Sequence, residues 1–220
     1  MDEIRFETDE AEAVRTITLA RPEKRNALTR EMFAALTEAF EREPPPTERV
    51  TVIRAEGPSF CAGVDLSQRD GNDAREGHTP LEVLCAAIWR YPLPVVAAVQ
   101  GHAIGGGLML LLHCDFVIAA EHAKMANSAV QRGMLPARDV IHRTRQVAGL
   151  PMARELLLIG DAIPASRLAD AQVITAAVPA EQLGAEVDRV VDRLAANAPL
   201  SLRAIEATLS ADEYVQTSAP

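Results

Sequence analysis

The fold is decided by residues 95–115, VVAAVQGHAIGGGLMLLLHCD. The apolar run at 95–100 predicts a buried strand, and the apolar run from Leu108 predicts a helix. The glycines between them allow backbone N–H groups to approach a ligand closely, beside the positive end of the helix dipole. Dinucleotide-binding turns have G-x-G-x-x-G spacing, which is missing here, so this turn suits an oxyanion better than a pyrophosphate. The alternative is that the glycines only let strand and helix pack closely.

A second glycine turn, CAGVDL at 61–66, follows the apolar strand predicted at 50–55. Two such turns on neighbouring strands can aim two backbone N–H donors at one carbonyl oxygen, which is the geometry of an oxyanion hole. Strands and helices alternate along the rest of the chain, and this predicts an α/β fold. The other expected strands cover 14–20, 116–120 and 173–178, and the other expected helices cover 30–41, 81–91, 138–147, 152–159 and 180–196.

The composition is that of a globular protein. Of the 220 residues, 48% are hydrophobic, and this fraction is too high for a disordered chain. The longest aliphatic run, Leu108–Leu112, is too short to cross a bilayer, so no membrane partner is expected. The net charge of -9 contains no basic block, which argues against nucleic acid as a partner.

The cysteines and the first residues indicate the compartment. Three cysteines, at positions 61, 85 and 114, are odd in number and lack CxxC spacing, so neither a disulfide framework nor a metal site is expected. The acidic start MDEIRFETDE lacks the pattern of a secretory signal. These features predict a cytoplasmic protein with reduced thiols.

Five motifs follow one another along the chain: RPEKRNALT (21–29), FCAGVDL (60–66), residues 95–115, RGMLP (132–136) and LLLIGDAIPASRLADAQVI (156–174). Together they resemble the motifs of the crotonase superfamily, the enoyl-CoA hydratase/isomerase family. The resemblance covers about residues 12–200 and implies a spiral of ββα units, assembled as a trimer or a dimer of trimers. It also implies an acyl-CoA thioester as the ligand, with coenzyme A as part of the substrate and no separate cofactor.

The resemblance also implies roles for individual residues. The backbone N–H groups of Val64 and Gly106 match the pair that holds the thioester oxygen as an enolate forms. The loop that lies along the pantetheine and adenine of CoA matches Lys24, Arg25, Ala27 and Leu28, and further CoA-side contacts match Ala62, Asp65 and Leu66. Lys24 and Arg25 are also suitable phosphate partners by charge alone, although a solvated loop would carry the same residues.

Two positions depart from the family pattern. The glutamates that position and activate water in a hydratase of this family match Met109 and Ala129. Neither side chain carries a proton or orients water, so the sequence argues against ordinary two-glutamate hydration and against the usual isomerase route. A drier, roomier acyl pocket is expected instead. The alternatives are a non-catalytic protein that binds acyl-CoA or an acyl-carrier thioester, and a biosynthetic decarboxylase or isomerase.

Asp139 is the candidate substitute for the missing acids. It lies three residues before His142 at the start of a predicted helix, so the two share a helix face. Asp139 as the proton carrier, with His142 as its partner, is one hypothesis; the other is that Asp139 only compensates the helix dipole.

The expected domains are a core at 1–195 and a shortened C-terminal helical segment at 196–220. Residues 67–79 are expected to form a mobile loop.

Overall fold

The chain is built on two β-sheets, seen in a computed structural model that describes residues 3–9, 13–68 and 79–211. The larger sheet has the strand order β1-β2-β3-β5-β7-β10, and all its pairs are parallel except β1 with β2. Its strands are β1 (Ile4–Asp9), β2 (Val14–Leu19), β3 (Val50–Ala55), β5 (Val95–Val99), β7 (Phe116–Ala120) and β10 (Ala176–Val178). The smaller sheet contains β4 (Ser59–Cys61), β6 (His102–Ile104), β8 (Lys124–Ala126) and β9 (Ile163–Pro164).

A repeated unit connects the two sheets. A long strand of the larger sheet is followed by a short strand of the smaller sheet and then by a helix. This unit occurs three times, as β3-β4-α2, β5-β6-α3 and β7-β8-α4, and it is the expected spiral of ββα turns. The helices of these units are α2 (Pro80–Trp89), α3 (Gly106–Leu112) and α4 (Arg138–Arg154).

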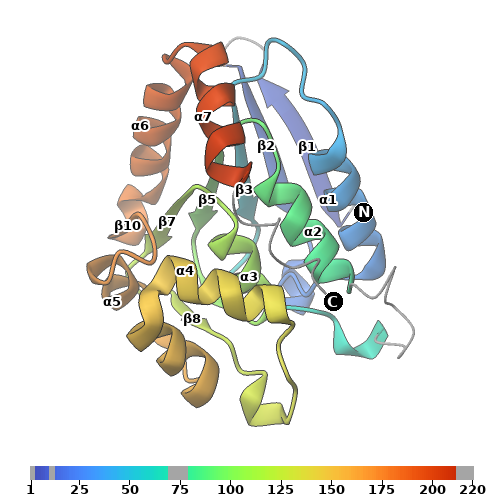
Figure 1. Cartoon of the computed structure of the whole chain (residues 1–220), viewed down its shortest axis with the longest axis vertical. Coiled ribbons are helices and arrows are strands. Elements are labelled where there is room, and N and C mark those ends of the chain that lie inside the picture. The colour runs from blue at the N-terminus through green and yellow to red at the C-terminus, as the bar shows by residue number, and fades with distance from the viewer. Residues whose placement is uncertain (1–2, 10–12, 69–78, 212–220) are drawn as a thin grey trace.

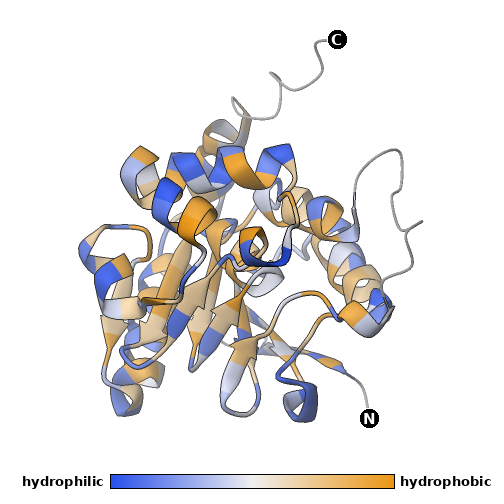
Figure 2. Ribbon diagram, turned by 90° about the horizontal axis from the view of Figure 1, so that it is seen from below, coloured by the Kyte–Doolittle hydropathy of each residue, from blue (hydrophilic) through white to orange (hydrophobic). Residues whose placement is uncertain are grey.

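Helices cover both faces of the larger sheet (Figure 1). One face packs against α6 (Leu183–Ala195), whose Leu183, Val187, Val190 and Val191 meet alternate residues of the strands. The other face packs against α1 (Arg30–Glu41), α2 and α3 in the main core. Figure 2 shows apolar residues along the central strands and a mixture of polar and apolar residues around the outer helices.

Most expected elements are present, with changes at their ends. The helix expected from Leu108 begins two residues earlier, at Gly106. The segments expected at 138–147 and 152–159 join, but Gly149 has a non-helical φ of 65° and breaks the path between them. The second segment continues as a π-helix, η4 (Glu155–Ile159), which ends at Gly160. The strand expected at 173–178 is reduced to β10. Short connecting elements are η1 (Pro22–Lys24), η2 (Leu66–Gln68), η3 (Val130–Arg132), η5 (Ala180–Gln182) and α5 (Ala165–Asp170).

The last described helix, α7 (Pro199–Ala211), packs back on the core. Trp89 Nε1 donates a hydrogen bond of 3.2 Å to the carbonyl oxygen of Ser210, and Arg203 forms a 2.7 Å ion pair with Glu43.

The expected domain boundary after residue 195 stays a prediction. The expected loop at 67–79 lies outside the described residues except for its two ends. In the described segments, no helix is both long enough and apolar enough to span a bilayer.

Two carboxyl groups face a cavity beneath α7, and their pKa values predict how stability changes with pH. Burial raises the pKa of Glu206 to about 7, with a smaller contribution from Asp115, and burial raises the pKa of Asp115 to about 6. A carboxyl group with a raised folded-state pKa favours folding while it is protonated, so its contribution is lost as pH rises.

The melting temperature of the Glu206→Gln variant is therefore expected to change less than that of the wild type between pH 4.5 and about 7. Solvent screening discounts the effect to about 1 kcal/mol, or roughly 2–4 °C. Calorimetry across this range, with Glu38→Gln on the exposed face of α1 as the control, measures the difference. Parallel pH curves for the wild type and Glu206→Gln would contradict the assignment.

Candidate active site

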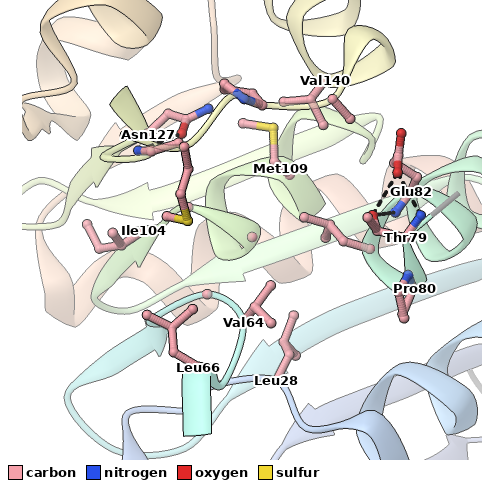
Figure 3. A pocket seen from close by; sticks show the side chains of 18 of the residues that line it. Leu28, Val64, Leu66, Thr79, Pro80, Glu82, Ile104, Met109, Asn127 and Val140 are labelled. Carbon is pink, nitrogen blue, oxygen red and sulfur yellow. Dashed lines mark hydrogen bonds between the residues drawn. The ribbon is translucent and has the colours of Figure 1, made fainter. Parts of the chain in front are cut away.

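A cavity of about 360 Å³ opens where the two glycine turns meet. Its wall is largely apolar and comes from α1, α2, α3, α4 and the turns after β4 and β8. In the view of Figure 3, Asn127 lies toward one end, Thr79 and Glu82 lie toward the other, and Val64 and Met109 lie between them. Eight residues proposed for the site from the sequence line this cavity: Leu28, Ala62, Val64, Asp65, Leu66, Gly106, Met109 and Ala129.

The N–H of Val64 has no acceptor in its turn, because the hydrogen bonds that fix the turn are made by the residues on either side of it. Leu28 N–H donates to the Gly63 carbonyl at 2.8 Å, and Asp65 N–H donates to the Leu28 carbonyl at 2.9 Å. Val64 is the residue that pairs with Leu28 in this short parallel bridge. Successive N–H groups of an extended chain point to opposite sides, so the N–H of Val64 points away from the Leu28 strand.

The Gly106 N–H is left free by its place at the start of α3, because the first N–H groups of a helix have no partner within the helix. Within the described part of the chain, neither this group nor the N–H of Val64 donates a hydrogen bond to a protein acceptor. Both therefore remain available to an oxygen atom of a ligand in the cavity.

The two turns lie against each other, which brings these N–H groups together. Gly63 has a φ of 95°, and a Cβ atom there would lie 3.2 Å from the Gly106 nitrogen and 2.8 Å from the Ile104 carbonyl oxygen. A Cβ atom on Gly106 would lie 3.4 Å from the Val64 nitrogen. The close approach needs glycine at position 63, for both conformation and space. Two adjacent, unpaired amide donors in an apolar cavity suit a developing negative charge on oxygen.

The two positions that the motif resemblance matches to glutamates lie in this cavity. Met109 is 2% exposed on α3, and Ala129 lies just before η3. Both line the cavity, so two apolar side chains occupy the wall where an acid pair was sought. This part of the wall is apolar, and the expectation that it holds an acyl group stays a prediction.

The sequence of the chain matches the family model described as enoyl-CoA hydratase/isomerase over residues 9–218. An enoyl-CoA isomerase/hydratase of Mycosarcoma maydis is 31% identical over 91% of this chain and 78% of its own length. A probable enoyl-CoA hydratase of Mycobacterium bovis is 32% identical over 96% of this chain and 84% of its own length. The chain belongs to the enoyl-CoA hydratase/isomerase family.

Solved structures agree with this assignment. An enoyl-CoA hydratase/carnithine racemase from Magnetospirillum magneticum superposes with a TM-score of 0.88 at 30% identity, covering 96% of this chain and 81% of that chain. An enoyl-CoA hydratase/isomerase from Pseudoalteromonas atlantica gives a TM-score of 0.86 at 29% identity, with 96% and 83% covered. The crotonase fold expected from the motifs is thus confirmed for this enoyl-CoA hydratase/isomerase family member.

The loop assigned to CoA borders the cavity in this family member. Lys24 and Arg25 are exposed and Ala27 is half-buried, and these three do not line the cavity itself. The Arg25 carbonyl accepts a 2.9 Å hydrogen bond from the N–H of Ala62, which joins the loop to the CAGVDL turn. The expected contacts of Lys24, Arg25 and Ala27 with CoA stay a prediction.

Asp65 anchors its turn. Its carboxylate forms a 2.7 Å ion pair with Arg21 and accepts hydrogen bonds from the backbone and hydroxyl of Ser67. Hydrogen bonds from Ser67 and Arg21 lower the pKa of Asp65 to about 2. This carboxylate is therefore committed to the fold rather than available for proton transfer.

Asp139 does not reach the cavity. Its neighbours Ala137 and Val140 line the wall, but Asp139 lines a separate cavity beside α1 and α2. His142 is exposed, and no hydrogen bond joins it to Asp139. Asp139 lies about 100° around the helix from Val140, so it faces away from the cavity that Val140 lines. The role of Asp139 as a proton carrier stays a prediction that this arrangement does not support.

Three cavity or loop residues were not identified from the sequence. Glu82 lines the cavity from the first turn of α2, and a signal for it exists, because Thr79-Pro80-Leu81-Glu82 has the spacing of a capping box. Asn127 lines the opposite end and is 4% exposed. Asn26 belongs to the loop at residues 24–28 and is fully buried.

Asn26 anchors the loop at residues 24–28 through three side-chain hydrogen bonds. Its Oδ1 accepts from the Arg21 N–H at 2.8 Å, and its Nδ2 donates to the carbonyls of Glu56 at 2.8 Å and Ser59 at 2.9 Å. Its φ of 53° lies in the left-handed region, which asparagine tolerates better than most residues. One side chain therefore fixes both the turn and its attachment to β4.

Asn26→Ala is expected to lower the free energy of unfolding by about 2–4 kcal/mol, because it leaves buried backbone groups without partners. The melting temperature should fall by roughly 5–10 °C. Differential scanning calorimetry measures the change, and Asn197→Ala at an exposed position after α6 is the matched control. Equal melting temperatures for the two variants would mean that Asn26 does not anchor the loop.

Proposed function

We propose that this protein binds an acyl-CoA thioester in the cavity and stabilises its enolate through the N–H groups of Val64 and Gly106. One observation carries the proposal: two adjacent, unpaired backbone donors face an apolar cavity in which the usual acids are replaced by Met109 and Ala129. The donors need no particular side chain, so this part of the chemistry survives those replacements.

The remainder of the substrate has a matching surface. The CoA moiety lies along the loop of Lys24, Arg25, Ala27 and Leu28, where the two cations face its phosphates. The acyl group enters the cavity between α3 and α4 and displaces water from its apolar wall. Ala62 and Leu66 line the entrance near the thioester.

The reaction proceeds through the enolate without activation of water by a glutamate pair. Reactions of this class include atypical hydration, isomerisation and decarboxylation. Thioester cleavage is a further option, since the same two donors would stabilise its tetrahedral oxyanion. The substrate is free CoA or a carrier-protein thioester with the same pantetheine arm. A cytoplasmic location and a homotrimer or dimer of trimers complete the proposal. The three free, buried cysteines support the location, and the motif resemblance supports the assembly.

A second candidate function is a non-catalytic acyl-CoA binding protein. The same two side chains, Met109 and Ala129, favour it, because a cavity without an acid pair at these two positions can hold a thioester without turning it over. Binding stabilises the folded protein in either case, so melting experiments with butyryl-CoA test the site but not the choice between the two functions.

Exchange of hydrogen at the α-carbon separates the two functions. Butyryl-CoA is incubated with the protein in D2O, and loss of the α-proton signal is followed by NMR. Enolate formation predicts steady replacement by deuterium at a rate well above that of the ester alone. Stabilisation of the protein by butyryl-CoA without exchange would support the binding protein, and neither stabilisation nor exchange would overturn the proposed function.

A further inference from the structure

The cavity contains a carboxylate that the sequence motifs do not assign. In the described residues, two carboxylate side chains line it, Asp65 and Glu82. Asp65 is bound to Arg21 and Ser67, as described above. Glu82, on the first turn of α2, is the carboxylate that remains for chemistry on a ligand.

Glu82 is held firmly but keeps one oxygen free. Its Oε2 accepts hydrogen bonds from the backbone N–H of Thr79 at 2.7 Å and from the Thr79 hydroxyl at 2.8 Å. Its own N–H donates to the Thr79 hydroxyl, which completes the capping box. No side chain or backbone group of the described residues donates to Oε1. The carboxylate is thus fixed through one oxygen and open at the other.

Glu82 contributes to the walls of two cavities. It lines a second, outer cavity of about 630 Å³, between α1 and α2. A proton taken up from the acyl cavity can therefore be exchanged with water in the outer one. The charged residues around Glu82 are Arg30, Asp65 and Arg132 in the acyl cavity and Glu41, Arg42, Glu43, Arg90 and Asp139 in the outer cavity.

The geometry points to Glu82 as the catalytic base that removes the α-proton of the bound acyl thioester, an inference that rests on the proposed function. The α C–H bond breaks and its proton passes to Glu82 Oε1. The electron pair forms the carbon–carbon double bond of the enolate, and the thioester oxygen takes the negative charge between Val64 and Gly106. Return of a proton from the Glu82 carboxylic acid to carbon restores the thioester, with no other reactant consumed.

The alternative is that Glu82 serves only as a helix cap, and Glu82→Gln distinguishes the two. Glutamine at this position also completes a capping box, so α2 keeps its start, but the amide cannot accept the proton. We expect the rate of deuterium incorporation into butyryl-CoA to fall by about 10²-fold or more. The dissociation constant for butyryl-CoA should change by less than about twofold, since a neutral isostere keeps the cavity shape.

The matched control is Glu38→Gln, which makes the same change at an exposed position of α1. Its exchange rate and affinity should equal those of the wild type. Wild-type rates in Glu82→Gln, with affinity unchanged, would overturn the role of Glu82 and leave the proposed enolate chemistry standing. Binding without any exchange by the wild type would overturn the role of Glu82 together with the enzymatic proposal.

Discussion

Gly106→Ala is expected to reduce α-proton exchange on butyryl-CoA by about 10²–10³-fold, the usual effect of losing one oxyanion donor. The added methyl group would lie 3.4 Å from the Val64 nitrogen and 3.5 Å from its Cγ2 atom. An oxygen that accepts from both N–H groups must lie about 3 Å from each nitrogen, so the methyl group competes for the same space.

The fold should tolerate this substitution. The contacts of the new methyl group are ordinary van der Waals distances, and none is shorter than 3.4 Å. The loss would therefore come from the site and not from unfolding, which a melting curve verifies. Gly184→Ala is the matched control, because a Cβ atom at this α6 position meets nothing within 4 Å. An exchange rate in Gly106→Ala equal to that of Gly184→Ala would show that the oxygen does not bind there.

Restoring both glutamates is expected to create a hydratase. In the Met109→Glu/Ala129→Glu variant, two carboxyl groups would again line the cavity beside the oxyanion donors. Positioned acid and base groups typically contribute about 10²–10⁴-fold each, so hydration of crotonyl-CoA should rise by at least about 10²-fold over the wild type. Loss of the enoyl absorbance measures the reaction directly.

The control for this variant is Met109→Gln/Ala129→Gln, which has nearly the same size and polarity but cannot transfer protons. It should remain as inactive in hydration as the wild type. Wild-type hydration at the rate of an ordinary hydratase would contradict the assignment of Met109 and Ala129 as the lost acids. Equal gains in the Glu and Gln variants would show that wetting of the cavity, and not proton transfer, limits hydration.

The fold was predictable from sequence where apolar periodicity and turn residues agree. The helix predicted at 30–41 begins where Thr29 caps it, and the Thr29 hydroxyl accepts a 3.2 Å hydrogen bond from the Met32 N–H. Helix α3 begins at Gly106, before the predicted Leu108, because burial against Cys61 overrides the low helix propensity of glycine. Strand β10 is short since only Ala176–Val178 pair with β7.

The backbone donors of the site could be predicted from the sequence, whereas its catalytic side chains were harder to predict. Val64 and Gly106 line one cavity; the two glycine turns suggested that such donors meet, and the motif resemblance implied these two residues. Asp139 and Glu82 both stand near helix starts, and only the packing of α4 and α2 decides which of them faces the cavity. Local sequence does not contain this information, because it depends on the rotation of each helix against the core.

The central claim is that the N–H groups of Val64 and Gly106 hold and polarise a thioester oxygen in the absence of the usual acid pair. Infrared difference spectroscopy of bound [1-¹³C]butyryl-CoA measures this polarisation directly. We expect the carbonyl stretch of the bound ester to lie at lower frequency than that of the free ester, and the shift to disappear in Gly106→Ala. A bound ester whose carbonyl frequency equals that of the free ester would contradict the claim.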